Sequence, residues 1–170
     1  METAEETAEE AMETVGETHE RFMSMALALA GLAAQQGEVP IGAVAVLNGQ
    51  VIGRGHNRRE MDKNPLAHAE LLALHEAARH LGAWRLLGVE LFVTLEPCSM
   101  CAGALLQSRI ARLVFGAHDP KAGAVGSLYN LLENARHNHR IEVVSGVSEA
   151  ACSLVLKRFF ATLRQSKAGR

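Results

Sequence analysis

The chain has 170 residues, of which 48% are hydrophobic and 21% are charged, and this composition is typical of one globular domain. No apolar run reaches the roughly 18 residues of a membrane span, and the N-terminus lacks the basic and apolar regions of a secretory signal. We therefore expect no membrane span and no secretory signal. Two of the three cysteines lie in one C-x-x-C, which argues against a disulfide scaffold and favours a reducing cytoplasm.

The formal net charge of −2 is unevenly distributed. Residues 1–20 contain eight Glu and no Lys or Arg, so the other 11 acidic residues and all 17 basic residues follow them. A basic body favours a polyanionic partner such as nucleic acid, although a charge of this size is common. We interpret residues 1–18 as an acidic tail that is disordered or a frayed helix, 19–165 as the folded domain, and 166–170 as a C-terminal tail.

Apolar periodicity and turn residues predict alternating helices and strands along the domain. Asn48-Gly49 is typical of a tight hairpin turn, and Pro65 and Gly82 bracket a helix. The predicted helices are 19–36, 65–81, 98–108 and 148–163, and the predicted strands are 41–47, 51–55, 91–95, 111–116 and 141–144. A glycine-rich loop occupies 117–127. About five strands with interleaved helices predict an α/β sandwich around one sheet.

Two short motifs carry the chemistry. His68 and Glu70 form an H-x-E, and Cys98 and Cys101 form a P-C-x-x-C with Pro97. One imidazole and two thiolates suit a zinc ion whose fourth position stays open for water, which is the arrangement of catalytic zinc sites. Both motifs begin predicted helices, where free N–H groups favour thiolates. Glu70 would then be a proton carrier rather than a ligand.

Other interpretations of these residues remain open. A C-x-x-C alone is also typical of a redox pair, and a fourth protein ligand would make the zinc structural. Cys152 is the one spare thiol, and its surroundings favour a small core residue. His75 lies two helical turns from His68, too far along a straight helix to share one metal. Glu96, before Pro97, we interpret as a structural carboxylate.

From about residue 19 to residue 165 the chain resembles the bacterial tRNA-specific adenosine deaminases of the cytidine/deoxycytidylate deaminase superfamily. The first half of the shared segments marks the superfamily, which includes deaminases of free bases, whereas 119–127 and 138–140 resemble the tRNA-acting branch. The shared segments are 39–44, 55–57, 67–70, 94–104, 107–110, 114–117, 119–127, 138–140 and 159–160.

The resemblance implies a three-layer α/β/α cytidine-deaminase-like sandwich around a mixed sheet of about five strands. It implies hydrolytic deamination of adenosine to inosine at the wobble position of a tRNA anticodon loop, with one Zn²⁺ per subunit. His68, Cys98 and Cys101 would hold the zinc, and Glu70 would move protons. Family members form homodimers, and the apolar helix around 100–107 is a candidate for part of the interface. A free guanine or cytosine deaminase and a non-catalytic zinc-bearing RNA-binding module are the alternatives.

The resemblance also suggests substrate contacts. Asn57 and the Ala69 backbone would bind the flipped base, although Asn57 also suits a turn at the end of a strand. Asp119 accepts from a ribose 2′-OH in one interpretation and caps a turn before Pro120 in the other. The remaining candidates for RNA contact are Lys121, Arg140, Lys157, Arg158, Arg164 and one of the two residues Phe159 and Phe160, of which Phe160 is our choice.

Overall fold

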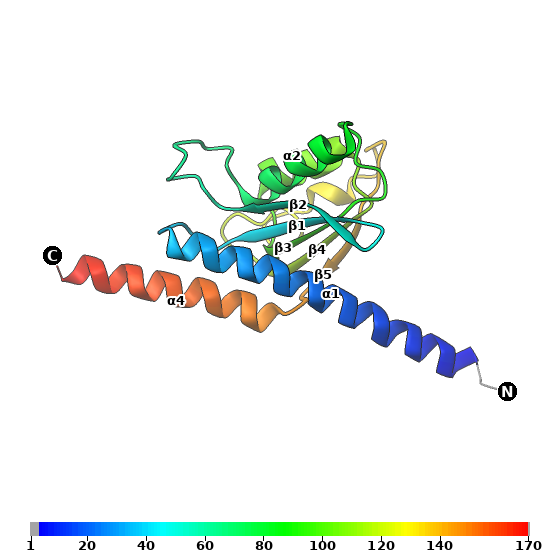
Figure 1. The fold of residues 1–170 in the computed structure, drawn as a ribbon, viewed down its shortest axis with the longest axis horizontal. Helices are drawn as coiled ribbons and strands as arrows, with labels where there is room; N and C mark the ends of the chain where they lie inside the picture. Colours follow the sequence, from blue (N-terminus) through cyan, green and yellow to red (C-terminus); the bar gives the residue numbers. More distant parts are fainter. Residues whose placement is uncertain (1–3, 170) are drawn as a thin grey trace.

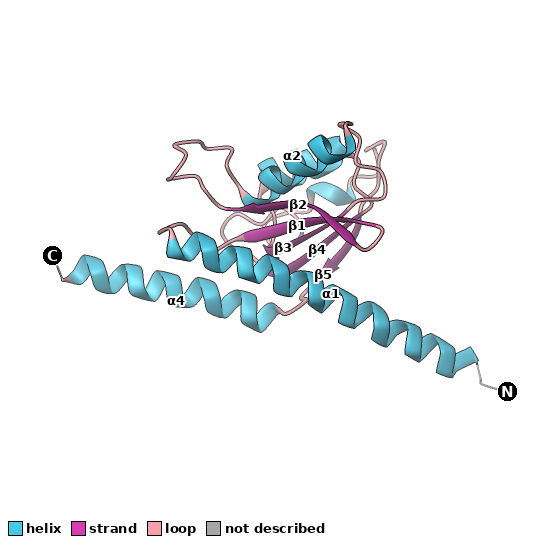
Figure 2. Ribbon diagram, in the orientation of Figure 1, coloured by secondary structure: helices cyan, strands magenta, loops and turns pink. Residues whose placement is uncertain are grey.

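The computed structural model describes residues 4–169, which form one twisted sheet with helices on both faces (Figure 1). Figure 2 shows the resulting three layers, with α1 and α4 on one face of the sheet and α2 on the other. The elements in chain order are α1 (Ala4–Gln35), β1 (Gly42–Leu47), β2 (Gln50–His56), α2 (Ala69–Leu81), β3 (Glu90–Leu95), α3 (Ser99–Ser108), β4 (Arg112–Ala117), the 3₁₀ helix η1 (Leu131–Glu133), β5 (Glu142–Ser145) and α4 (Glu149–Ala168).

The sheet is mixed, as the sequence predicts. Its strand order is β2-β1-β3-β4-β5, with β1 antiparallel to both neighbours and β3, β4 and β5 mutually parallel. The Asn48-Gly49 turn joins β1 to β2 with positive φ at both residues, 50° and 75°, as a type I′ hairpin turn requires. The loops that follow β3 and β4 therefore meet at one edge of the sheet, where parallel α/β sheets commonly hold their sites.

Alternate residues of β1 enter two separate hydrophobic cores. Ala43 and Ala45 face α2 and α3, whereas Val44 and Val46 face α1 and α4. This alternation follows from the two-residue period of a strand, and the continuous apolar sequence of the strand reflects burial on both faces. The sheet is thus fixed from both sides.

Close approach of α2 to β2 depends on two glycines. A Cβ atom at Gly55 would overlap the carbonyl oxygen of Ala69, and one at Gly53 would overlap that of Ala73. The missing side chains let the helix backbone rest directly on the strand. This contact sets the position of the N-terminus of α2, which carries Ala69 and Glu70.

The predicted elements occur, but several boundaries differ. Helix α1 begins at Ala4 rather than at residue 19, so the described backbone of the predicted tail is helical, and its side chains at 14–18 are exposed. Helix α4 continues to Ala168, beyond the predicted end at 163 and into the predicted C-terminal tail. Helix α2 starts at Ala69, four residues after the predicted start at Pro65, and His68 is its N-cap. The division of the chain at residues 18 and 165 stays a prediction.

None of the helices in residues 4–169 combines the length and apolar character that crossing a membrane demands.

Candidate active site

Three side chains from two helix starts converge at the edge of the sheet. His68 is the N-cap of α2, Cys98 is the N-cap of α3, and Cys101 lies in the first turns of α3. The Nδ1 atom of His68 is 3.7 Å from the Sγ of Cys98 and 3.6 Å from the Sγ of Cys101. The three potential ligand atoms all lie within 4.8 Å of one another.

This spacing fits a metal ion. Tetrahedral zinc with nitrogen at about 2.0 Å and sulfur at about 2.3 Å separates neighbouring ligand atoms by roughly 3.6 Å. Within residues 4–169, no other group of three His, Cys, Asp or Glu side chains is placed to hold an ion. Cys152 is buried in the core on the α1 side of the sheet, as the sequence predicts, and neither it nor His75 joins the group.

The two thiols differ in acidity. The pKa of Cys98 is lowered to about 3, mainly because the Cys101 thiol donates a hydrogen bond to its sulfur and because His68 lies beside it. The pKa of Cys101 is raised, mainly because it is the donor in that bond and because it is buried. The group therefore favours a thiolate at Cys98, which is the form of the side chain that binds a metal ion.

Glu70 lies beside these three residues with 4% of its surface exposed, in the first turn of α2. Burial removes water from its carboxylate and raises its pKa to about 7. A carboxyl group in this range can both accept and donate a proton near neutral pH, as a general acid and base requires.

A cavity of about 690 Å³ opens over this group. It contains eight of the ten predicted site residues: Asn57, His68, Ala69, Glu70, Cys98, Asp119, Lys121 and Phe160. Cys101 is fully buried just behind Cys98, so the structure brings nine of the ten together. The predicted phosphate contacts Lys157 and Arg164 also line the cavity.

Arg140 is the exception. It is exposed, its Nη2 atom lies 3.5 Å from the carbonyl oxygen of Ala135, and it does not line the cavity. It precedes β5, whose first residue pairs with Arg112 at the start of the parallel β4, whereas the cavity lies beyond the end of β4. A contact between Arg140 and RNA stays a prediction.

Asn57 serves the cavity wall and the turn at once. Its Nδ2 donates to the carbonyl oxygen of Val39 at 3.3 Å, and its Oδ1 accepts from the backbone N–H of Arg59 at 3.2 Å. An amide group has a second hydrogen and a second lone pair, so it can still bind a ligand in the cavity. Both sequence interpretations are therefore compatible with its position.

Glu96 organises the loop between β4 and η1. Its carboxylate is 2% exposed and accepts from the backbone N–H groups of Asp119, Val125 and Ser127 at 2.9 to 3.0 Å, and from the Ser127 hydroxyl. A Cβ atom at Gly123 would overlap this carboxylate, so the loop needs glycine there. The structural role predicted for Glu96 is confirmed.

Asp119 caps a turn in the same loop. Its Oδ1 accepts from the backbone N–H groups of Lys121 and Ala122 at 3.0 and 3.2 Å. This confirms the turn-capping interpretation, and a contact with a ribose 2′-OH stays a prediction.

Comparison with known proteins agrees with this geometry. The sequence matches the MafB19-like deaminase family over residues 17–164. It is 53% identical to the tRNA-specific adenosine deaminase of Bacillus subtilis (strain 168) over 148 residues, covering 87% of this chain and 92% of that protein. The chain belongs to the tRNA-specific adenosine deaminase family.

Other members and neighbours extend this assignment. The tRNA-specific adenosine deaminase of Haemophilus influenzae is 47% identical over 152 residues, covering 89% of this chain and 88% of that protein. A structure solved in studies of A-to-I editing by tRNA:A34 deaminases superposes with a TM-score of 0.75 at 43% identity, covering 80% of this chain and 99% of that one. A guanine deaminase from Nitrosomonas europaea gives 0.70 at 27% identity, with 84% of each chain covered.

Sequence reasoning missed several residues of this deaminase cavity. Arg59 and His118 line it, and Leu156 joins Phe160 from the same face of α4. The signal for Arg59 was its place two residues after Asn57, and the signal for His118 was its place directly before Asp119. Neither residue belongs to a sequence motif, so their place in the cavity wall follows only from the folded structure of the two loops.

Proposed function

We propose that the protein is a zinc-dependent hydrolase that converts adenosine to inosine at the wobble position of a tRNA anticodon loop. The observation that carries this proposal is the convergence of His68, Cys98 and Cys101 beside the buried Glu70, at the floor of a cavity that His68, Cys98 and Glu70 line. The identity of 53% to a tRNA-specific adenosine deaminase supports the substrate assignment.

Zinc held by His68, Cys98 and Cys101 would lower the pKa of a bound water so that hydroxide is available near neutral pH. Glu70 would accept one proton of the attacking water and deliver it to N1 of adenine as the water oxygen bonds to C6. Glu70 would then carry the proton of the new C6 hydroxyl to the amino group, so that the C6–N6 bond breaks, ammonia leaves and the C6 carbonyl of inosine remains. A carboxyl pKa of about 7 suits both transfers, because neither protonation state is strongly favoured.

Asn57 and the backbone of Ala69 line the same cavity and are the groups we assign to the base. Deamination requires the base to leave its stack, and an anticodon loop offers unpaired bases at low cost. Phe160, 40% exposed at the cavity wall, presents an aromatic ring on which a neighbouring base can stack.

Four cationic side chains on the cavity wall favour a polyanionic substrate. Arg59, Lys121, Lys157 and Arg164 come from three separate segments. The carboxylates beside them are Glu70 and Glu96, both buried, and Asp119, which caps its own loop. Positive charge at the rim attracts phosphates and is unnecessary for a free neutral base.

We also infer a homodimer. Met100, Gly103, Ala104 and Gln107 form one face of α3 that is not fully buried, and a Cβ atom at Gly103 would meet no neighbour. The small residues Gly103 and Ala104 at the middle of this face let a second copy approach closely. Sedimentation equilibrium should give twice the chain mass, and a monomer across the concentration range would overturn the inference.

A reducing cytoplasm is the location we propose, because the metal group needs both thiols free of disulfide.

The substrate assignment is tested by offering anticodon stem-loop RNA, free adenine, free guanine and free cytosine in parallel. We expect inosine in the RNA and no conversion of the bases. Conversion of a free base alone would favour the free-base alternative, and zinc and RNA binding without any conversion would favour the non-catalytic module.

A further inference from the structure

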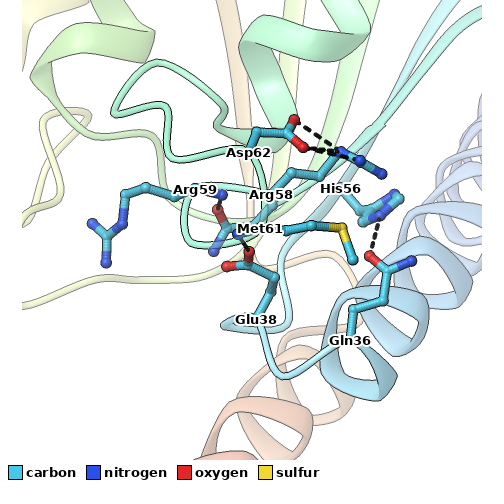
Figure 3. A network of polar contacts seen from close by, with 8 residues as sticks. Gln36, Glu38, His56, Arg58, Arg59, Met61 and Asp62 are labelled. Atoms are coloured by element: carbon cyan, nitrogen blue, oxygen red, sulfur yellow. Dashed lines mark hydrogen bonds and ion pairs between the residues drawn. The ribbon is translucent and has the colours of Figure 1, made fainter.

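A buried carboxylate sits in the connection between α1 and β1. Glu38 is 2% exposed, although glutamates are rarely buried unless a partner offsets their loss of water. Its Oε1 accepts a hydrogen bond from the backbone N–H of Met61 at 2.6 Å. Figure 3 shows the carboxylate beneath the backbone of the segment that contains Met61.

Met61 belongs to a loop that separates two site residues. The loop spans 58–67, with Asn57 directly before it and His68 directly after it, and its ends are joined by the 3.0 Å bond from the Arg58 N–H to the Ala67 carbonyl oxygen. The base of the loop is therefore closed next to the cavity. Its outer part, which includes Met61, projects from that closure.

The same α1–β1 connection also holds the base of the loop. His56 Nε2 and Gln36 Oε1 lie 3.0 Å apart (Figure 3). The Asn57 backbone N–H donates to the Ile41 carbonyl oxygen at 3.0 Å. These bonds anchor residues 56 and 57, whereas the bond from Met61 to Glu38 reaches further out. Glu38 thus fixes the part of the loop around Met61, where the other hydrogen bonds are turns within the loop itself.

Arg59 is the residue that this anchoring places over the cavity. Its N–H donates to Asn57 Oδ1, and its carbonyl oxygen accepts from the Asn64 N–H at 3.1 Å. Figure 3 shows the side chains of Arg58 and Arg59 extending to opposite sides of the loop. Arg58 is paired with Asp62 at 3.0 Å, while Arg59 lines the cavity.

We propose that Glu38 is a positioning residue for substrate binding, which holds the 58–67 loop so that the Arg59 guanidinium faces the phosphates of the RNA. The inference rests on the proposed function, because it assigns Arg59 a phosphate partner. Glu38 lines no part of the cavity and touches no reacting atom. We therefore expect its loss to change substrate binding rather than the chemical step.

Steady-state kinetics with anticodon stem-loop RNA test this role. Glu38→Ala leaves Met61 without its acceptor, so KM should rise about three- to tenfold while kcat stays within about twofold and the zinc content is unchanged. Glu38→Gln keeps a side-chain carbonyl oxygen at the same reach and should restore most of the KM. Gln36→Ala, a matched loss from the same connection without a bond to Met61, should leave KM within about twofold of the wild type.

Arg59 supplies the link between anchor and substrate. Arg59→Ala should raise KM by a similar factor, and combining it with Glu38→Ala should add little, because both changes remove one contact. Additive effects, or a kcat loss with unchanged KM in Glu38→Ala, would overturn the proposal.

Hydrogen exchange gives an answer that does not depend on turnover. The Met61 amide should be protected in the wild type and should exchange faster in Glu38→Ala, with Gln36→Ala as the control. An unprotected Met61 amide in the wild type would refute the anchor even if the variants fold poorly. Protection in a protein that does not deaminate RNA would instead refute the proposed function and leave the anchor standing.

Discussion

Two buried carboxylates border the cavity and differ in what surrounds them. Burial raises the pKa of Glu70 to about 7. Burial alone would also raise the pKa of Glu96, but hydrogen bonds from Ser127 and from the Asp119 and Val125 N–H groups outweigh it and lower that pKa. Environments that shift the pKa values of two carboxyl groups in opposite directions make one of them a proton carrier and keep the other ionised.

Glu70→Ala tests the proton carrier. The three metal ligands remain, so we expect one zinc per chain as in the wild type. Deamination should fall by about 10²- to 10⁴-fold, which is the usual contribution of a positioned general acid and base. Zinc analysis and inosine quantification on one preparation measure both, and retained turnover would disprove the assigned role.

Glu96→Gln tests the loop anchor. The substitution turns one accepting oxygen into a donor amide among N–H groups, so we expect a loss of about 1–3 kcal/mol in the free energy of unfolding. KM for the RNA should also rise, because Asp119 and Lys121 lie on the loop that Glu96 holds. Ser127→Ala, which removes a single donor, should lose less in both measurements. Equal effects from the two variants would contradict the anchor.

At this scale the sequence identifies residues that form motifs and misses those that do not. His68, Glu70, Cys98 and Cys101 carry fixed spacings that zinc chemistry explains. Glu38 is a single Glu in a connection, and its burial depends on a loop more than twenty positions away. No pattern in the sequence indicates such a contact.

Among the elements, the strands are predicted closely and the helix ends are not. Each predicted strand lies within about one residue of an observed one, because apolar runs bounded by turns have few alternatives. Helix α1 continues to Ala4 because Ala and Glu are strong helix formers even without an apolar face to bury. Helix propensity is therefore enough to form the first turns of α1 without packing against a hydrophobic core.

His19 connects helix α1 to the sheet and predicts a pH effect. It is 9% exposed and packs edge-on against Phe92, and burial and the nearby Arg112 lower its pKa, while Glu90 and Glu142 oppose this. The unfolded chain therefore takes up a proton at His19 below its ordinary pKa of 6.5, while the folded chain resists. Stability from this residue is complete above that pH and is lost as the pH falls.

The free energy of unfolding should accordingly drop less between about pH 7.5 and about pH 5.5 in His19→Leu than in the wild type. Urea unfolding at the two pH values measures the difference. An identical drop in both proteins would contradict the lowered pKa.

We expect the N-terminal part of α1 to contribute little to activity. In Figure 1 the N-terminal end of α1 extends away from the sheet, whereas the C-terminal half runs beside α4. Thr14, Val15 and Thr18 line a hollow with Glu90, Phe92 and Arg112, and none of these residues lines the cavity of the metal group. Deleting residues 1–18 should therefore leave kcat/KM within a few fold. A large increase in the truncated chain would instead indicate that the acidic segment inhibits RNA binding.

At the scale of the whole molecule, six separate parts of the chain form the cavity. Lining residues come from the connection between α1 and β1, the loop after β2, the start of α2, the segment from the end of β3 to the start of α3, the loop after β4 and one face of α4. The sequence predicts the sheet and the two helix starts, and through them the metal group. It does not predict how α4 crosses the cavity edge, because a helix face is assigned only by what it packs against.

The proposed activity needs both the metal group and an RNA substrate, so the most direct measurement determines zinc content and RNA deamination on one sample. Zinc content and inosine formation are measured for the purified protein with anticodon stem-loop RNA, before and after metal removal and zinc restoration. We predict one zinc per chain, inosine at the wobble base alone, and turnover that is lost and restored with the metal. Turnover of the RNA by zinc-free protein, or no inosine from the zinc-loaded protein, would contradict the account.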